Sequence, residues 1–584
     1  MRFPSAAALA RRAWAVALRF PWTLAAAALA AFAACMATGA SGTSEDDWGR
    51  LAMTSMLAVP LTTAITLAGE RRGWSRLATF LGQLAGLGLI ALFHATWDGP
   101  REQWEMLRYV QLSAALHLLV AVLPFIRGAE TTAFWDYNRR LLLAFLRAVV
   151  FSAVLFIGLA IALGALDKLF GVSVQPKVYA RLWLVIALLG NTWIFLAALS
   201  DDVTLSDERV VYPRALKVFT QYILTPLVAV YLVILTAYLA KIVVTREWPS
   251  GWIGWLVGSV AVSGILGFLL VHPLRQERDE GWIAIYARWL FIGLIPAAIM
   301  LLLALGKRIA PYGLTELRVI ALALGVWLLT VAAVYTLRPA SGIRLIPLSL
   351  AALLAVLMAG PFSATRLGVR SQSHRLDRML ATISRGTGAA GAPAMSADTQ
   401  REIGAATRYL VERDARGPLE RTFHTRLAAE LTGPRQSADS TAARLLATRS
   451  IAYAPELYRT GKYRSAQRPR ATPVTTTGYD WLFEVEAGDT GTIALPGDSL
   501  HYESDSARTT FTLAGRTDTL RFDLAPAARA LAGSAAAEPA WNDSAFVVPA
   551  SGLRYRGLLA LRSVYRYDTN ALAGWSGQLL LAPR

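Results

Sequence analysis

Two arginines stand inside apolar stretches, where a charge could take part in transport or catalysis. Arg147 lies in LLLAFLRAVVFSAV and Arg288 in WIAIYARWLFIGL. A charged side chain within a membrane span marks a functional site by default, because burying it is costly. Both arginines lie about six or seven residues from the end of their stretch, roughly 10 Å deep at about 1.5 Å per residue, from where a long side chain can reach the interface. Structural anchoring and a functional polar cluster therefore both remain open.

The polar-cluster interpretation has two further supports. Arg140 and Arg147 are seven residues apart and so share one face of a helix. Acidic residues expected at the same end of the spans could pair with these arginines, namely Asp201, Asp202, Asp279 and Glu280.

Polar residues also interrupt two other apolar stretches. In GNTWIFLAAL, Asn191 and Thr192 lie in the middle of a span, where they either hydrogen-bond to a neighbouring helix or contact a substrate or ion. In YILTPLVAV, Pro226 is expected to kink its helix, with Thr225 available to satisfy a freed carbonyl.

The stretch PYGLTELR, residues 311–318, predicts a turn followed by a helix start. Thr315 is expected to be the N-cap, and Glu316 in the first turn complements the helix dipole. Arg318 can reach lipid headgroups or a neighbouring carboxylate. Glu316 is also the one acid that we nominate for any chemistry at the membrane interface.

Familiar catalytic and ligand-binding patterns do not occur in the sequence. The histidines at 94, 117 and 272 are scattered, with no HExxH, and there is no GxxxxGK[ST], GxGxxG or GxSxG motif in a suitable context. The single cysteine, Cys35, excludes an intrachain disulfide and a cysteine metal site. We therefore predict no catalytic residue, no cofactor and no metal.

The composition is that of a protein that crosses a membrane many times. Hydrophobic residues make up 55% and charged residues 17% of the 584 residues, which is lean for a water-facing surface. The net charge of +18 is explained by arginines in loops that face anionic lipid, rather than by nucleic-acid binding. The lipid bilayer is thus the expected partner, and the sequence does not indicate an oligomeric state.

Hydropathy predicts an all-α bundle of about eleven spans between residues 21 and 361. The expected spans are 21–38, 51–69, 78–96, 109–126, 141–166, 178–199, 216–240, 252–272, 282–305, 314–336 and 344–361. Residues 1–20 are expected to lie along the cytoplasmic interface, although a cleaved signal peptide is the rival interpretation. Because arginines concentrate in alternate loops, the N-terminus is expected inside and the C-terminus outside, in the periplasm.

Beyond residue 361 the pattern becomes that of a soluble α+β tail. Residues 362–470 are arginine-rich with helical periodicity in HRLDRMLATI and REIGAATRYLVERD, which predicts a basic helical connector. Residues 471–584 read as a small β-rich domain, in which TTFTLAGRTDTLRFDL alternates around a four-residue turn as a hairpin does.

Several stretches together carry a family resemblance. They are FWDYNRRLLLAFLRAVVFSAVLFIGLAIALGALDKLFGV, LGNTWIFLAAL, YPRALKVFTQYILTPLVAVYLVILTAYLAKI, YGLTELR and SQSHRLDRML. In these, over roughly residues 134–380, the chain resembles the bacterial inner-membrane protein family called domain of unknown function 4153. The resemblance implies a multi-pass location in the inner membrane and no agreed activity, so it provides no catalytic or binding residues.

Three classes of function fit these observations. The first is an envelope scaffold or sensor, in which the bundle anchors an extracytoplasmic domain that binds an envelope protein or polymer. The second is a transporter or channel built around Arg147, Arg288, Asn191 and Thr192, against which no internal repeat and no pair of matching interrupted helices is evident. The third, a membrane-embedded enzyme acting on lipid-linked substrates, has the least support.

Overall fold

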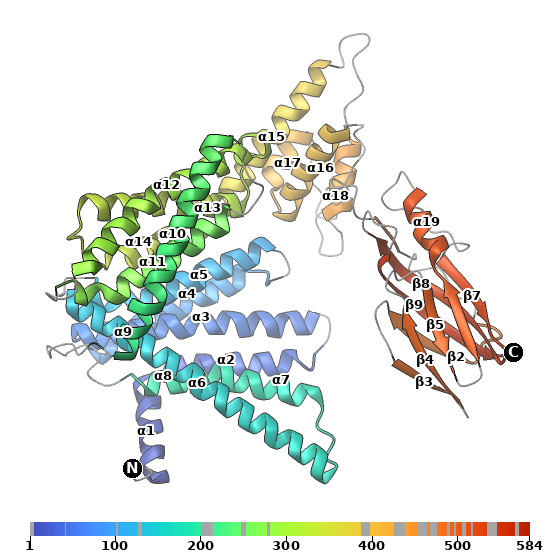
Figure 1. Ribbon diagram of the computed structural model, residues 1–584, viewed down its shortest axis with the longest axis horizontal. Helices are drawn as coiled ribbons and strands as arrows, with labels where there is room; N and C mark the ends of the chain where they lie inside the picture. Colours follow the sequence, from blue (N-terminus) through green and yellow to red (C-terminus); the bar gives the residue numbers. More distant parts are fainter. Residues whose placement is uncertain are drawn as a thin grey trace. The chain divides into compact units, whose positions relative to one another are not determined.

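Figure 1 shows the computed structural model of the chain. The residues that it describes are 5–40, 43–100, 103–126, 131–199, 212, 214–246, 253–276, 281–386, 397–424, 438–449, 451, 453, 464–467, 476–486, 491–495, 498–504, 510–515, 518–533, 546–566 and 572–584. The chain forms two compact units, Met1–Gln372 and Ser373–Arg584.

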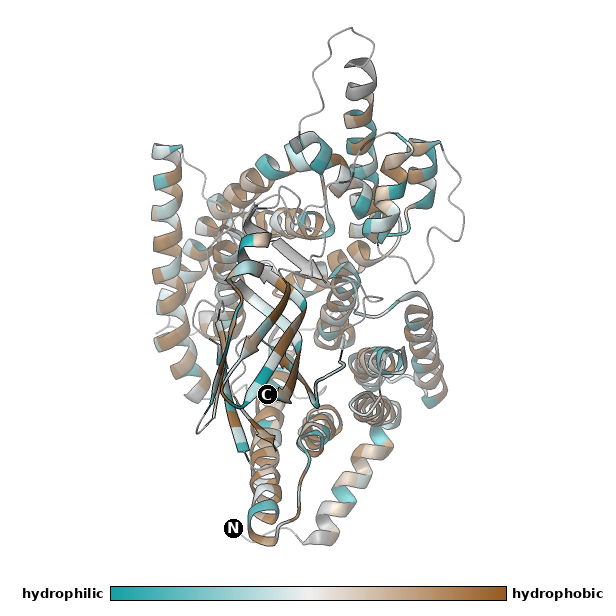
Figure 2. Ribbon diagram, turned by 90° about the vertical axis from the view of Figure 1, so that its right-hand side faces the viewer, coloured by the Kyte–Doolittle hydropathy of each residue, from teal (hydrophilic) through white to brown (hydrophobic). Residues whose placement is uncertain are grey.

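The first unit is helical. Its elements are α1 (Ala6–Arg19), α2 (Pro21–Ala37), α3 (Thr43–Arg72), α4 (Arg76–Thr96), α5 (Gln103–Val122), η1 (Leu123–Phe125), α6 (Thr131–Phe170), α7 (Pro176–Leu184), η2 (Val185–Gly190), α8 (Asn191–Ala197), α9 (Arg214–Val218), η3 (Phe219–Leu224), α10 (Thr225–Thr245), α11 (Ile253–Val271), η4 (His272–Gln276), α12 (Gly281–Tyr312), α13 (Glu316–Leu337) and α14 (Leu345–Met358). The next helix, α15 (Ala364–Gly386), begins in this unit. Figure 2 shows hydrophobic colour along the length of these helices.

All eleven expected spans correspond to helices, but they differ in length. In the described part of the chain, nine helices are long and apolar enough to cross a membrane, and the α1–α2 pair, bent by 100°, makes a tenth. The eleventh, α14, has only 14 residues, or about 21 Å against a hydrocarbon core of about 30 Å. The expected span to 361 was too long, because Gly360 adopts a left-handed conformation (φ +80°) and Pro361 follows it.

Close packing of α3 against its neighbours organises the first half of this unit. The Thr23 and Thr62 hydroxyls share a buried hydrogen bond of 2.8 Å between α2 and α3, and the Gln83 amide of α4 donates to Thr66 at 2.7 Å. A Cβ atom added at Gly86 of α4 would lie 3.1 Å from the Ile65 Cδ1 of α3. Small and hydroxylic residues thus let the helices approach closely, as is usual in membranes.

The second unit begins with helices and ends with strands. Its helices after α15 are α16 (Ala397–Glu412), α17 (Arg416–Phe423) and α18 (Ala438–Ala447), so the connector predicted at 362–470 is helical in its described residues up to Ala447. Near its end the prediction was wrong, because Arg464–Gln467 form strand β1, which pairs with β8 (Tyr555–Arg566). Ile403, Leu410 and Leu446 are fully buried, and an ion pair joins Arg375 of α15 to Glu402 of α16 at 3.0 Å.

The C-terminal part is a sandwich of two antiparallel sheets. One sheet has the order β3-β4-β5-β6; in the other, β1-β8-β9-β2 run in order and β7 also pairs with β8. The strands are β1 (Arg464–Gln467), β2 (Trp481–Glu486), β3 (Gly491–Leu495), β4 (Asp498–Ser504), β5 (Thr510–Ala514), β6 (Thr519–Asp523), β7 (Val547–Ser551), β8 (Tyr555–Arg566) and β9 (Leu572–Pro583), with α19 (Ala525–Gly533) between β6 and β7. The predicted hairpin is confirmed, because Ala514 pairs with Thr519 and leaves four residues between β5 and β6.

One buried carboxylate ties the two sheets together. Asp518, directly before β6, accepts a backbone N–H bond from Thr519 (2.9 Å). It also accepts N–H bonds from Leu553 (2.6 Å), Arg554 (2.8 Å) and Tyr555 (2.9 Å), which lie before and at the start of β8. Burial opposes ionisation, but these N–H donors hold the pKa of Asp518 below its usual value.

Candidate functional site

Besides the hydrogen bonds within the spans, many polar contacts of the helical unit lie at two ends. The first is formed by helix ends rich in arginine. We call it the arginine end; its hydrogen bonds and ion pairs involve Arg19, Glu70, Arg72, Leu123, Phe125, Trp135–Arg140, Leu199, Tyr212, Leu269, Leu270 and Arg344. These residues come from the loops and helix ends that the alternation of charge assigns to one side of the membrane. The described residues that flank the expected cytoplasmic loops therefore lie at a common end.

Within the arginine end, the segment WDYN caps two helices that proline terminates. The Val120 carbonyl of α5 has no intrahelical donor four residues on, because that residue is Pro124. The Tyr137 hydroxyl donates to this carbonyl at 2.7 Å. In the same way Pro273 follows Leu269 by four residues, and the Trp135 indole N–H donates to the Leu269 carbonyl at 2.8 Å.

Neighbouring side chains complete these two caps. The Asn138 amide donates to the Ala121 carbonyl at 3.3 Å, and Arg72 and Arg344 donate to the carbonyls of Leu123 (2.7 Å) and Phe125 (3.2 Å). The last carbonyls of a helix lack internal partners, and cations are favoured there by the helix dipole. Tyr212 stacks on Trp135, with ring centroids 5.4 Å apart, and donates to the Leu270 carbonyl of α11 at 3.0 Å.

Two groups of ion pairs brace the same end. Arg19, the last residue of α1, binds both carboxylate oxygens of Glu70 at 2.8 Å and donates to the Leu199 carbonyl at 2.9 Å. Asp136 accepts from Arg139 at 2.6 Å and from Arg140 at 2.7 Å. The bend between α1 and α2 is thus tied to α3 and to the end of α8.

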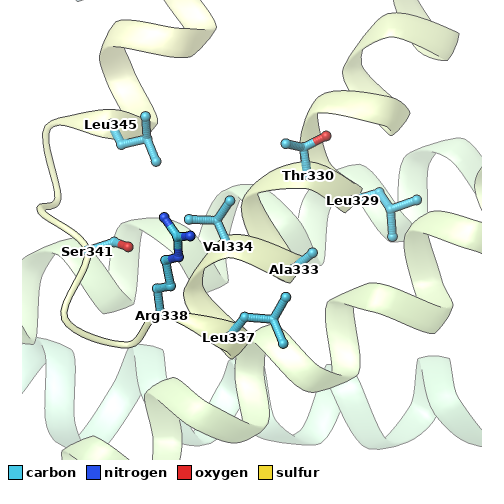
Figure 3. Close-up of a pocket in the computed structure, with 8 residues that line it drawn as sticks. All are labelled: Leu329, Thr330, Ala333, Val334, Leu337, Arg338, Ser341 and Leu345. Atoms are coloured by element: carbon cyan, nitrogen blue, oxygen red, sulfur yellow. The ribbon is translucent and has the colours of Figure 1, made fainter.

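A groove opens at the arginine end between α13 and the start of α14 (Figure 3). It has a volume of about 670 Å³ and is lined by Leu329, Thr330, Ala333, Val334, Leu337, Arg338, Ser341 and Leu345. In Figure 3 the Arg338 side chain rises through the middle of the groove, with Val334 on one side and Ser341 on the other.

The second polar end includes a junction between the segments PYGLTELR and SQSHRLDRML. The Gln372 amide of α15 donates to the carbonyls of Tyr312 and Leu314, both at 2.9 Å, and the Leu314 N–H donates to the Ser371 hydroxyl at 2.9 Å. Arg318 donates to the Gly313 carbonyl at 2.7 Å. The turn after α12 is therefore hydrogen-bonded to α15 at Ser371 and Gln372.

The turn itself is shorter than expected. Pro311 and Tyr312 are the last residues of α12, and Gly313 follows them in a left-handed conformation (φ +68°). Thr315 is the N-cap residue of α13 as predicted, but its side chain makes no capping hydrogen bond. Glu316 is 4% exposed, so its side chain is buried within the helical unit.

The arginines of the predicted polar cluster have the following surroundings. Arg140 shares Asp136 with Arg139. Arg147 is exposed and donates to the Leu143 carbonyl of its own helix at 3.1 Å, and Arg288 lies on the exposed side of α12. The acidic partners expected for them, at 201, 202, 279 and 280, lie outside the described residues.

Asn191 and Thr192 follow a π-helical turn. The Asn191 N–H bonds to the Ile186 carbonyl five residues back, its side-chain oxygen accepts from Ser152 of α6 at 3.3 Å, and the Thr192 hydroxyl bonds to the Leu188 carbonyl of its own span at 2.6 Å. These contacts match the interhelical and local hydrogen bonding that the sequence left open as one interpretation.

A second π-helical turn, η3, directly precedes Pro226. The Thr225 N–H bonds to the Thr220 carbonyl five residues back, which accommodates the donor that proline lacks. The Thr225 hydroxyl is buried without a hydrogen-bond partner among the described residues, so the expectation that it satisfies a freed carbonyl was wrong.

Sequence reasoning missed the residues that hold both ends together, chiefly Trp135, Tyr137 and Gln372. A signal for the first two existed, since Pro124 and Pro273 each leave a carbonyl that needs a donor. Gln372 carried no such signal. Among the described residues, no three His, Cys, Asp or Glu side chains are grouped to hold a metal ion.

Comparison with known proteins places these segments in one family. The family model described as "Domain of unknown function (DUF4153)" matches residues 22–395, which include the second polar end and all of the arginine end except Arg19. An uncharacterized protein, PM1469, of Pasteurella multocida (strain Pm70) is 23% identical over 181 residues, and the match spans 30% of each chain. No solved structure matches the chain.

Proposed function

Since the chain belongs to the family of domain of unknown function 4153, whose description names no activity, we propose its function from the geometry. We propose that it is a multi-pass protein of the bacterial inner membrane that anchors its C-terminal β-sandwich in the periplasm, as an envelope scaffold or sensor. The sandwich binds an envelope protein or polymer there, and the helical unit holds it at the membrane.

The observation that carries this proposal is the course of α14. Its start lies at the arginine end, where Arg344 donates to the Phe125 carbonyl. Its last turn is at the other end, where Leu357 and the following Ala364 pack with Val319 of α13. The short helix therefore passes from one end of the unit to the other, and α15 begins away from the arginine end.

The distribution of arginine supports the sidedness. Cytoplasmic loops carry an excess of Lys and Arg, which favours a cytoplasmic location for the arginine end. The start of α15, and with it the second unit that α15 enters, then belongs on the periplasmic side.

Cysteine labelling tests the sidedness directly, because the chain has a single cysteine. In a Cys35→Ser background, Ala340→Cys probes the arginine end and Ser551→Cys probes the β-sandwich. Both positions are exposed. With a membrane-impermeant maleimide on spheroplasts, Ser551→Cys should be labelled at once and Ala340→Cys only after lysis. The reverse pattern would place the sandwich in the cytoplasm and end the proposal.

Deletion of residues 471–584 tests the anchoring role. The truncated chain should still insert, but it should fail to complement loss of the full chain. A sandwich-bearing chain with Leu482→Ser, on the exposed side of β2, serves as a control that keeps the domain. Full complementation by the truncated chain would refute the scaffold or sensor role.

A transporter or channel is the second candidate, favoured by one observation. Two consecutive spans carry π-helical turns, η2 and η3, each followed directly by polar residues, and broken helices in related positions mark transport sites. Ion flux into proteoliposomes under a KCl gradient tests it. This candidate requires flux that survives deletion of 471–584 and falls in Asn191→Ala, whereas the scaffold requires no flux in either chain.

A further inference from the structure

The groove of Figure 3 combines an apolar wall with one cation. Leu329, Ala333, Val334, Leu337 and Leu345 contribute only hydrocarbon. The Thr330 hydroxyl donates to the Val326 carbonyl of its own helix at 2.8 Å, so its hydrogen is already used in a backbone hydrogen bond. The guanidinium of Arg338 is the charged group of the lining.

Arg338 differs from the other arginines around it. The guanidinium groups of Arg344 and Arg72 donate to the carbonyls of Phe125 and Leu123, respectively. Among the residues that the structure describes, no carboxylate or carbonyl accepts a hydrogen bond from the Arg338 side chain, which is exposed. Its five N–H donors are available to an anion.

The groove has the dimensions and position of a lipid site. Leu329 lies nine residues before Arg338, so the lining extends about 13 Å along α13 from the arginine end toward the middle of the unit. The outward surface of α13 is apolar, with Val326 half exposed and Leu337 80% exposed. A ligand entering from the bilayer would thus meet hydrocarbon along its length and a cation at the polar end.

We propose that this groove binds an anionic phospholipid of the surrounding bilayer. The lipid phosphate forms charge-assisted hydrogen bonds with the Arg338 guanidinium, which suits a phosphate oxygen pair in geometry. The upper part of one acyl chain lies against Leu329, Val334 and Leu345. Charge complementarity decides the headgroup, because the arginine end is basic and basic pockets between membrane helices favour anionic lipids.

The test measures lipid binding to the full chain in detergent by native mass spectrometry. The probes are phosphatidylglycerol and phosphatidylcholine, titrated into delipidated protein. Arg338→Gln should weaken phosphatidylglycerol binding about tenfold, as expected for loss of a hydrogen bond to a charged group, and should leave the weaker phosphatidylcholine binding unchanged. Arg288→Gln is the matched control, because Arg288 is exposed and lies outside the groove lining.

A second variant separates the groove from the charge. Thr330→Trp fills the groove from an exposed position, so folding is not endangered, and it leaves Arg338 intact. It should also weaken phosphatidylglycerol binding about tenfold or more. Binding that survives Thr330→Trp, or that falls equally in Arg288→Gln, would mean a diffuse charge effect and overturn the proposal. Displacement of the lipid by millimolar glycerol phosphate would assign the site to a soluble phosphate instead.

Discussion

The cap that Tyr137 provides for α5 can be tested by a double-mutant cycle with Pro124. Tyr137→Phe removes the donor to the Val120 carbonyl and leaves that buried carbonyl unpaired. Side-chain hydrogen bonds between membrane helices contribute about 0.6 and at most about 1.7 kcal/mol, and an unpaired buried carbonyl costs about 1–3 kcal/mol. We therefore expect Tyr137→Phe to lower the free energy of unfolding by about 1–2 kcal/mol.

The same substitution should cost much less when Pro124 is replaced by alanine. Residue 124 then regains a backbone N–H, which can bond to the Val120 carbonyl four residues back. The coupling between the two substitutions should be about 1 kcal/mol, measured by unfolding the full chain in mixed detergent and SDS micelles. Trp135→Phe is the control, because its partner carbonyl belongs to α11 and it should show no coupling to Pro124→Ala.

Additivity would refute the capping argument. If the effects of Tyr137→Phe and Pro124→Ala add within about 0.3–0.5 kcal/mol, the Tyr137 hydroxyl is not replacing the proline's missing donor. Equal coupling of Trp135→Phe to Pro124→Ala would instead indicate a general loosening of the arginine end.

Three further substitutions test the packing, the junction and the sandwich. Gly86→Leu should destabilise the helical unit by about 1–3 kcal/mol by overpacking, whereas Gly88→Leu, with open space around it, should be nearly neutral in the same unfolding assay. Gln372→Ala should speed hydrogen exchange of residues 312–318, since two carbonyls lose their donor; unchanged exchange would show that the junction is held otherwise. Asp518→Asn should cost the sandwich about 2–4 kcal/mol, because an amide cannot accept all four N–H bonds, measured as faster exchange of residues 555–566. Because the pKa of Asp518 is lowered in the folded protein, its contribution to the stability of the sandwich is present above the ordinary Asp pKa of about 3.9. This contribution is lost as the pH falls through the pKa of the folded state. Pepsin digestion of the sandwich should therefore accelerate with acid in the wild type and depend less on acid in Asp518→Asn.

Local physics made much of this fold predictable from the sequence. Long apolar runs predicted the eleven spans, each of which corresponds to helix in the described residues, because a backbone out of water must satisfy its hydrogen bonds internally. Strict alternation with a four-residue turn located the β5–β6 hairpin in its correct register. The end of α14 was misplaced, because the left-handed conformation of Gly360 stops the helix before the apolar run ends.

The polar sites were harder to predict because their partners are far apart in the chain. Arg147 and Arg288 were predicted as candidate functional residues because they lie deep within apolar stretches. Both lie on exposed helix faces, where a long side chain can extend toward the interface. Trp135 and Tyr137 looked like ordinary aromatic residues, although each donates to a carbonyl that a proline leaves open, 134 and 17 residues away. In a membrane unit, a proline near a helix end therefore predicts that the carbonyl four residues before it requires another hydrogen-bond donor. The tertiary fold determines which side chain is that donor. The shared need explains why tryptophan, tyrosine and asparagine, all hydrogen-bond donors, cluster in one short segment that reaches two helices at once.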